Sequence, residues 1–77
     1  MYTTKITVFN NRRPLNGVRI TLEFRGLTQM GFTTPVYTDG EGIAYIQHAS
    51  SGEAYVYLDH EPQRDPIKTP GRETYNL

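Results

Sequence analysis

The stretch that decides the fold is TDGEGIA, residues 38–44. It has the composition of a strand end, a tight glycine-containing turn and the start of the next strand. An Asp-Gly pair between apolar alternations is a strong local signal for a β-hairpin. Upstream, residues 14–22 read PLNGVRITL, which indicates a second turn that leads into a second strand. The two stretches together predict an all-β fold, a small antiparallel β-sandwich.

The alternation of apolar and polar residues is clearest in residues 18–25. A period of two is typical of a strand with one buried face and one solvent-facing side. Here the apolar side consists of Val18, Ile20, Leu22 and Phe24, and the polar side of Arg19, Thr21, Glu23 and Arg25. Residues 53–59 alternate in the same way, which predicts that Tyr55 and Tyr57 point outward.

Three further segments are expected to be strands. Residues 3–9 are rich in β-branched side chains, and their alternation places Ile6 and Val8 inward. Residues 32–38 contain Pro35, which lacks a backbone donor, so this strand is expected at an edge or with a bulge. Residues 43–47 do not alternate cleanly, and this predicts a strand that is covered on both faces.

The C-terminal segment, residues 61–77, differs in composition from the rest. Pro62, Pro66 and Pro70 recur at every fourth position, which excludes a helix and a central strand. We therefore expect a sandwich domain over residues 1–60 and an irregular, proline-rich extended tail over residues 61–77. The tail either packs back on the sheet or is partly disordered, with a short last strand near its end. An incomplete sandwich would leave an exposed sheet edge that can pair with another chain.

Size and composition bound the possibilities. The chain has 77 residues, enough for one small domain, and no cysteine, so no disulfide or thiolate site is available. No apolar stretch approaches the roughly 20 residues of a membrane span. The N-terminus lacks the apolar core of a signal peptide, which favours a cytoplasmic or virion-associated protein. No glycine-rich phosphate loop occurs, and no cofactor is expected.

The charges balance overall, with eight basic and eight acidic residues, but they are unevenly distributed. Residues 1–25 carry five basic residues against Glu23 alone, a net of +4, and residues 26–61 carry five acidic and no basic residues. Neutralisation between neighbouring strands is the simplest interpretation. The alternative is a basic stacking surface for nucleic acid, formed by the arginines of the first region, Arg12, Arg13, Arg19 and Arg25. Zero net charge makes a nucleic-acid partner the less favoured one.

Two motifs carry a resemblance to known domains. Pro14, Gly17, Val18, Ile20 and Leu22 fit the pattern Pro-x-x-Gly-Val-x-Val-x-Leu, and Thr38, Asp39, Gly42 and Ala44 fit Thr-Asp-x-x-Gly-x-Ala. With GEAYVYL at residues 52–58, the chain resembles carboxypeptidase-regulatory-like and Cna-B-like domains. That resemblance implies a transthyretin-like, immunoglobulin-like sandwich. It implies little about function, because such folds have many roles.

Chemistry that occurs in relatives of this fold is not expected here. Hydroxyisourate hydrolases end in Tyr-Arg-Gly-Ser, whereas this chain ends in Tyr-Asn-Leu. Some Cna-B-like domains form a Lys–Asn isopeptide bond, for which Lys5, Asn76 and the Glu23 carboxylate would be the candidates, but alternation places Lys5 and Glu23 on solvent-facing sides. The run Asp59-His60-Glu61 is interpreted as a polar strand exit, and residues 48–52, with His48, Ser50 and Ser51, as a connecting loop. We therefore expect neither an enzyme nor a metal site.

Tyrosine is unusually frequent, with six residues in the chain. Clustered, exposed tyrosines are common anchors for protein binding, because each offers a large contact area with few torsions and one polar tip. The predicted partner-binding residues share the outer sheet face and are Tyr37, Tyr55, Tyr57, Arg19 and Arg25. Equally compatible with the sequence is a proline-rich tail that covers these rings.

The sequence therefore favours a non-enzymatic protein-interaction module. Such a module could be a small adaptor, an inhibitor or a structural component of a larger assembly such as a virion. It would bind a protein partner through the tyrosine face or through an open sheet edge, which would also permit a homo-oligomer. The alternatives are nucleic-acid binding through the arginines and carbohydrate binding through stacking on Tyr55 and Tyr57.

Overall fold

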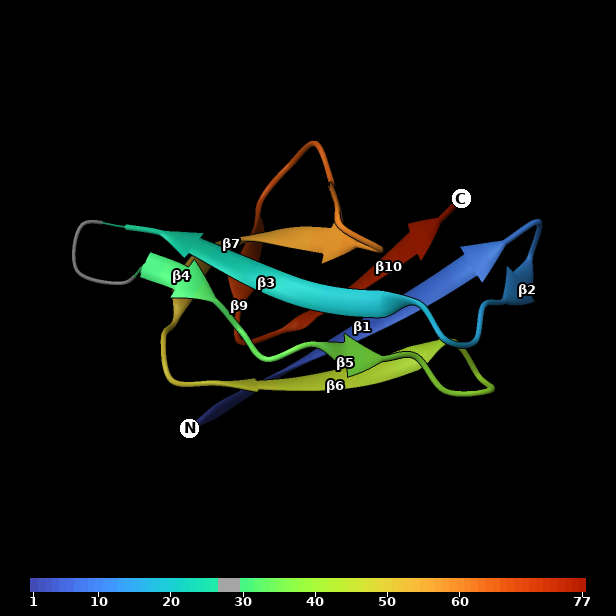
Figure 1. The fold of residues 1–77 in the computed structure, drawn as a ribbon, viewed down its shortest axis with the longest axis horizontal. Coiled ribbons are helices and arrows are strands. Elements are labelled where there is room, and N and C mark those ends of the chain that lie inside the picture. The colour runs from blue at the N-terminus through green and yellow to red at the C-terminus, as the bar shows by residue number, and fades with distance from the viewer. Residues whose placement is uncertain (27–29) are drawn as a thin grey trace.

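The computed structural model describes residues 1–26 and 30–77. In these residues the chain forms ten strands in two sheets, without a helix (Figure 1). The strands are β1 (Tyr2–Asn10), β2 (Arg13–Pro14), β3 (Arg19–Arg25), β4 (Met30–Phe32), β5 (Val36–Tyr37), β6 (Ile43–His48), β7 (Gly52–Leu58), β8 (Glu61–Pro62), β9 (Ile67–Thr69) and β10 (Arg72–Asn76). The predicted all-β sandwich is confirmed.

The first sheet is built around β1. Strand β6 pairs antiparallel with residues 2–7 of β1, and β2 pairs antiparallel with its last two residues. Strand β10 pairs with β1 in parallel, from Lys5 opposite Arg72 to Phe9 opposite Asn76. The sandwich is therefore antiparallel except where the first and last strands meet. Parallel pairing requires a long connection, and here almost the whole chain lies between the two strands.

The second sheet is built around the pair β3 and β7. These strands run antiparallel, with Ile20 opposite Leu58 and Glu23 opposite Tyr55. Two short strands, β4 and β5, pair with β3, and two others, β8 and β9, pair with β7. This sheet carries the surface that is described in the next subsection.

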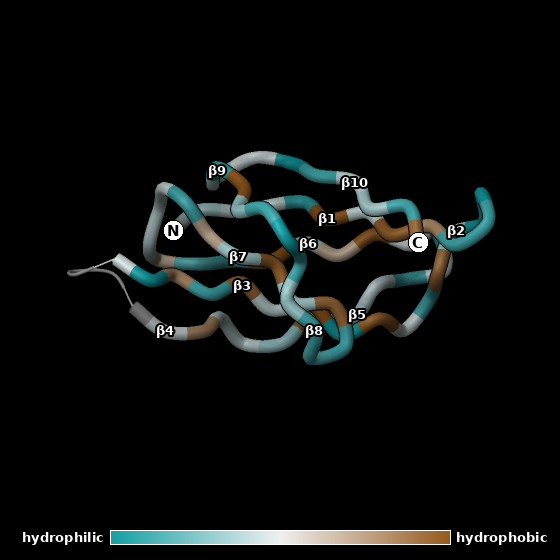
Figure 2. Tube along the Cα trace, turned by 90° about the horizontal axis from the view of Figure 1, so that it is seen from above, coloured by the Kyte–Doolittle hydropathy of each residue, from teal (hydrophilic) through white to brown (hydrophobic). Residues whose placement is uncertain are grey.

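The core lies between the two sheets and consists of the inward-facing residues of β1, β3, β6 and β7. Polar and apolar residues alternate along β3 and β7 in Figure 2. The fully buried large side chains are aliphatic apart from Thr4: Ile6, Val8, Ile20, Leu22, Ile46 and Val56. Burial of each such aliphatic chain contributes roughly 1.5–3 kcal/mol. The faces predicted for residues 6, 8, 18–25 and 53–59 are thus confirmed.

Strand β6 corrects the prediction for residues 43–47. It alternates regularly, with Ala44, Ile46 and His48 buried and Tyr45 57% exposed. One face of β6 is therefore open to solvent. The prediction failed because both β6 faces carry apolar or aromatic side chains, which conceals the period of two.

The turn at residues 38–44 has the structure that its sequence predicts. The Asp39 Oδ1 atom accepts hydrogen bonds from the backbone N–H groups of Glu41 (2.8 Å) and Ile43 (3.0 Å). Gly42 has a φ of +77°, and a Cβ atom there would lie 2.5 Å from the carbonyl oxygen of Val8. A glycine is required here both for the backbone angle and for the close approach of β1.

Thr38 joins the two sequence motifs. Its side chain is buried, and its Oγ1 atom donates to the carbonyl oxygen of Leu15 (2.6 Å) and accepts from the N–H of Val18 (2.9 Å). Backbone hydrogen bonds between Gly17 and Thr38 and between Thr38 and Val18 complete the contact. The turn that precedes β3 and the turn that precedes β6 therefore stabilise each other.

The C-terminal segment corrects the prediction of an irregular tail. Residues 61–77 are extended, but they form β8, β9 and β10 and belong to both sheets. Ile67 joins the buried core, and Tyr75 packs against it. The prolines fit because they lie at strand ends or between strands, and because β9 and β10 each pair with a single neighbour in the described residues.

Candidate interaction surface

The outer face of the second sheet gathers four aromatic side chains. Register places Tyr55 and Phe32 on either side of Glu23, places Tyr57 opposite Thr21, and places Tyr37 opposite Arg19. Directly paired residues of neighbouring strands point to the same face of a sheet. We call this surface the aromatic face, and it comprises Phe32, Tyr37, Tyr55 and Tyr57 together with Arg19, Glu23 and Arg25.

The structure brings all of the sequence-predicted site residues to this one face. Tyr55, Tyr57, Arg19 and Arg25 follow from alternation within β3 and β7, and Tyr37 joins them through the pairing of β5 with β3. Sequence reasoning missed Phe32. In one continuous strand, Phe32 and Tyr37 would point to opposite faces, since they are five positions apart. The chain breaks between β4 and β5, where the Thr33 Oγ1 atom accepts from the N–H of Leu22 (2.9 Å), and both rings therefore face outward.

Glu23, Arg25 and Tyr57 form a hydrogen-bonded network in the middle of this face. The Arg25 Nε atom donates to Glu23 Oε1 (2.7 Å), and the Tyr57 hydroxyl donates to the same oxygen (2.9 Å). The Arg25 guanidinium also lies over the Tyr55 ring, 3.8 Å from its centroid. Desolvation raises the pKa of Glu23, but the hydrogen bonds from Arg25 and Tyr57 and the arginine charge outweigh this and lower it below its usual value.

The rings remain accessible. Phe32 and Tyr37 are each 59% exposed, whereas Tyr55 and Tyr57 are half-buried by their neighbours. Phe32 meets Tyr57 edge to face, with ring centroids 5.1 Å apart. The C-terminal segment reaches this face only at its margin, where the exposed Pro62 lies opposite Tyr57. The sequence left open whether these rings are exposed or are covered by the proline-rich segment, and in the structure that segment does not cover them.

A hollow of about 280 Å³ lies within the aromatic face. Its lining consists of Arg19, Thr21, Phe32, Thr33, Tyr57 and His60. Thr21 is only 3% exposed although it belongs to the outer side of β3, because the larger side chains around it rise above it. The Arg19 Nη1 atom lies 3.4 Å from Nδ1 of His60, which is in the tight turn between β7 and β8.

The predicted arginine surface is not assembled on one face. Arg12 and Arg13 lie in the β1–β2 hairpin of the first sheet, and Arg12 there has a φ of +65°. Arg19 and Arg25 project from the outer face of the second sheet, and Arg25 is paired with Glu23. Sequence distance gave no information about this separation, since it depends on which sheet each strand joins.

His48 corrects its assignment to the connection of residues 48–52, because it is the last residue of β6 and is buried. It is 4% exposed and lies between the rings of Tyr2 and Phe24. Its Nδ1 atom is 2.5 Å from the carbonyl oxygen of Ser50, and its Nε2 atom is 2.8 Å from the Thr4 hydroxyl. A carbonyl oxygen only accepts, so Nδ1 donates to Ser50, and the Thr4 hydroxyl group is the hydrogen-bond partner of Nε2.

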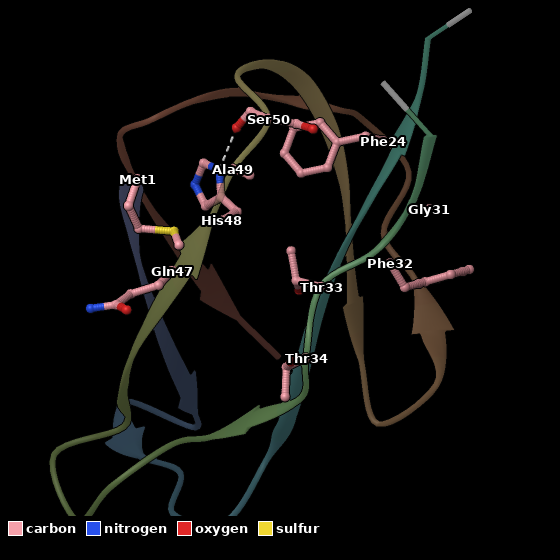
Figure 3. Close-up of a pocket in the computed structure, with 10 residues that line it drawn as sticks. All are labelled: Met1, Phe24, Gly31, Phe32, Thr33, Thr34, Gln47, His48, Ala49 and Ser50. Atoms are coloured by element: carbon pink, nitrogen blue, oxygen red, sulfur yellow. Dashed lines mark hydrogen bonds between the residues drawn. The ribbon is translucent and has the colours of Figure 1, made fainter. Parts of the chain in front are cut away.

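A second hollow of about 280 Å³ lies beside His48, at one end of the sandwich (Figure 3). Thr33 and Thr34 line its other side, and Phe32 points away from it. Both nitrogens of His48 are already bonded, and the partner at position 50 is the backbone carbonyl group rather than the serine hydroxyl. The arrangement therefore lacks the serine–histidine contact of a nucleophilic dyad.

The residues considered for an isopeptide bond are not brought together. Lys5 in β1 and Asn76 in β10 belong to the first sheet, where Lys5 is opposite Arg72 and Asn76 is opposite Phe9, whereas Glu23 belongs to the outer face of the second sheet. Among the described residues, no three His, Asp or Glu side chains gather in a way that could hold a metal ion. Within residues 1–26 and 30–77 there is also no helix long and apolar enough to cross a membrane.

Comparison with known proteins supports the fold alone. No protein-family model matches the sequence, and no curated protein matches it. Among solved structures, the Bacillus anthracis TIE protein is similar, with a TM-score of 0.61 and 17% sequence identity. The similarity covers 99% of this chain and 16% of that chain. At this identity the likeness concerns the arrangement of strands in space, and the two-sheet sandwich is the feature that the two proteins share.

Proposed function

We propose that this domain is a non-enzymatic protein-binding module and that its aromatic face makes the contact. The observation that carries this proposal is the gathering of Phe32, Tyr37, Tyr55 and Tyr57 on one uncovered sheet face. Tyrosine and arginine are enriched among the residues that dominate binding energy at protein interfaces. The outer side of the second sheet has both residue types at its centre.

The network of Glu23, Arg25 and Tyr57 supports the same proposal. Ordering flexible side chains at an interface costs about 0.5–1.5 kcal/mol for each. Here the Glu23 carboxylate holds both Arg25 and Tyr57, and Arg25 in turn rests on the Tyr55 ring. Much of that ordering has therefore taken place before a partner binds.

The alternatives find less support in the geometry. A nucleic-acid surface needs several unpaired cations along one groove, but two of the four arginines lie in the other sheet and Arg25 is neutralised by Glu23. Sugar binding by stacking on Tyr55 and Tyr57 finds less support, because Arg25 lies over the Tyr55 ring and Phe32 contacts the Tyr57 ring. We therefore favour a protein partner.

The test is affinity capture from a lysate of the organism that encodes the chain. The bait with Phe32→Ser and Tyr37→Ser changes two exposed rings of the aromatic face. The matched control is Tyr45→Ser, because Tyr45 is exposed to the same degree but lies on β6 of the first sheet. Thermal denaturation establishes that each bait is folded.

We expect a protein that the wild type and the Tyr45→Ser bait retain and that the double variant loses. A partner that all three baits retain equally would exclude the aromatic face as the contact. In that case the free edge of β10 becomes the next candidate, since β10 pairs only with β1 among the described residues.

A further inference from the structure

We infer that the hollow between Arg19, His60, Phe32 and Tyr57 receives a carboxylate side chain, an aspartate or glutamate, of the bound protein. This inference rests on the proposed function and specifies the chemistry of the partner. The observation behind it concerns Arg19, the one cation of the aromatic face that forms no ion pair with a described residue.

Arg19 is the unneutralised charge of this face. The Glu23 carboxylate is engaged by Arg25 and by the Tyr57 hydroxyl, so it does not serve Arg19. The described residues give the Arg19 guanidinium no carboxylate partner. Asp59 lies near in the fold, but its Oδ1 atom accepts from the backbone N–H of Arg19 (2.9 Å).

The contact between Arg19 and His60 leaves most donors free. A guanidinium has five N–H donors and no acceptor, so the His60 Nδ1 atom must be the acceptor in the 3.4 Å contact with Arg19 Nη1. A neutral imidazole does not neutralise the arginine charge. The remaining donors suit a carboxylate, which arginine binds through two parallel hydrogen bonds.

The shape of the hollow suits an acidic side chain rather than a free anion. Its floor is the buried Thr21, and its walls include the rings of Phe32 and Tyr57, which offer apolar surface for the methylene groups that carry the carboxylate. The hollow of about 280 Å³ opens on the aromatic face itself. The hollow contains one positive charge, that of Arg19, whereas binding the polyanionic backbone of a nucleic acid would require several.

The test is a selection of random short peptides for binding to the full chain, with the selected peptides then titrated against variants. We expect the selected peptides to contain Asp or Glu, and we expect Arg19→Gln to weaken their binding about tenfold. Changing the acidic residue of the peptide to its amide should also weaken binding about tenfold. Arg19→Gln combined with the amide peptide should weaken binding little more than either change alone. Arg19→Glu should bind the peptide that has lysine in place of its acid.

The outcomes separate the two levels of the proposal. Peptides that lose binding to Phe32→Ser/Tyr37→Ser but show no acidic preference and bind Arg19→Gln equally would overturn the carboxylate assignment and leave the protein-binding face intact. A selection that yields no binder, or only binders indifferent to the aromatic face, would overturn both. A single-stranded RNA oligonucleotide is titrated in parallel, and RNA binding that depends on Arg19 and displaces the peptides would also overturn the assignment.

Discussion

Gly42 lies where the turn of residues 38–44 approaches β1. Any other residue there would be strained for two reasons: the φ of +77° is unfavourable for a residue with a side chain, and its Cβ atom would lie 2.5 Å from the carbonyl oxygen of Val8. We expect Gly42→Ala to lower the free energy of unfolding by more than about 2 kcal/mol, measured by urea denaturation. The control is Gly17→Ala, which has a similar φ of +80° but no atom within 4 Å of the added Cβ. It should lose only about 1 kcal/mol, and equal losses would show that the backbone angle alone matters.

Tyr75 has a buried hydroxyl group that forms no hydrogen bond with any residue of the described ranges 1–26 and 30–77. An unsatisfied buried hydroxyl costs about 1–3 kcal/mol, so Tyr75→Phe should leave stability unchanged or raise it by about 1 kcal/mol. Urea denaturation at neutral pH measures this difference. A clear loss of stability would mean that the hydroxyl has a partner in solution.

The same residue gives the protein a pH dependence. Burial, and secondarily the Glu73 carboxylate, raise the pKa of Tyr75 from 10.0 to about 12. Because the folded-state pKa lies above the unfolded one, the protonated form stabilises the fold fully below about pH 10, and this contribution is lost as pH rises toward 12. Tyrosinate absorbance of the wild type should contain a late component that Tyr75→Phe lacks. Identical alkaline titration curves for the wild type and Tyr75→Phe would contradict the raised pKa of Tyr75.

At the scale of elements, the C-terminal strands are part of the sandwich. Ile67 in β9 is buried with the core residues, so Ile67→Ala should lower the free energy of unfolding by about 2–4 kcal/mol. The neighbouring Lys68 is exposed, and Lys68→Ala should change stability by less than about 0.5 kcal/mol. Urea denaturation of the two variants side by side gives the comparison. A negligible effect of Ile67→Ala would mean that β9 does not contribute to the folded core.

Elements with a regular period were predictable, and those without one were not. Apolar and polar residues alternate over residues 18–25 and 53–59, so the faces of β3 and β7 could be assigned from sequence. Strands β2, β5 and β8 have two residues each, too few for any period. The proline-rich segment concealed β9, because short extended pieces between prolines have the same sequence signal whether they pair or not. The short last strand that the sequence suggested for residues 73–77 is present as β10.

At the scale of the whole molecule, long-range pairing decided what sequence could not. The candidate site was largely predictable, because alternation alone places Arg19, Arg25, Tyr55 and Tyr57 outward. Its completion by Phe32 and the hollow around Arg19 required the pairing of β4 with β3 and the turn after β7. Likewise, the parallel pairing of β1 with β10 joins the two ends of the chain, and no local pattern encodes it.

The measurement that tests the protein-binding face most directly is photo-crosslinking in living cells of the encoding organism. The photoreactive residue p-benzoylphenylalanine is placed at Tyr37 on the aromatic face, at Tyr45 on the opposite sheet, or at Thr74 on the β10 edge. All three positions are exposed. We expect a discrete protein adduct from position 37 and none from position 45. Adducts from position 45 or 74, with none from position 37, would contradict the aromatic face as the binding surface.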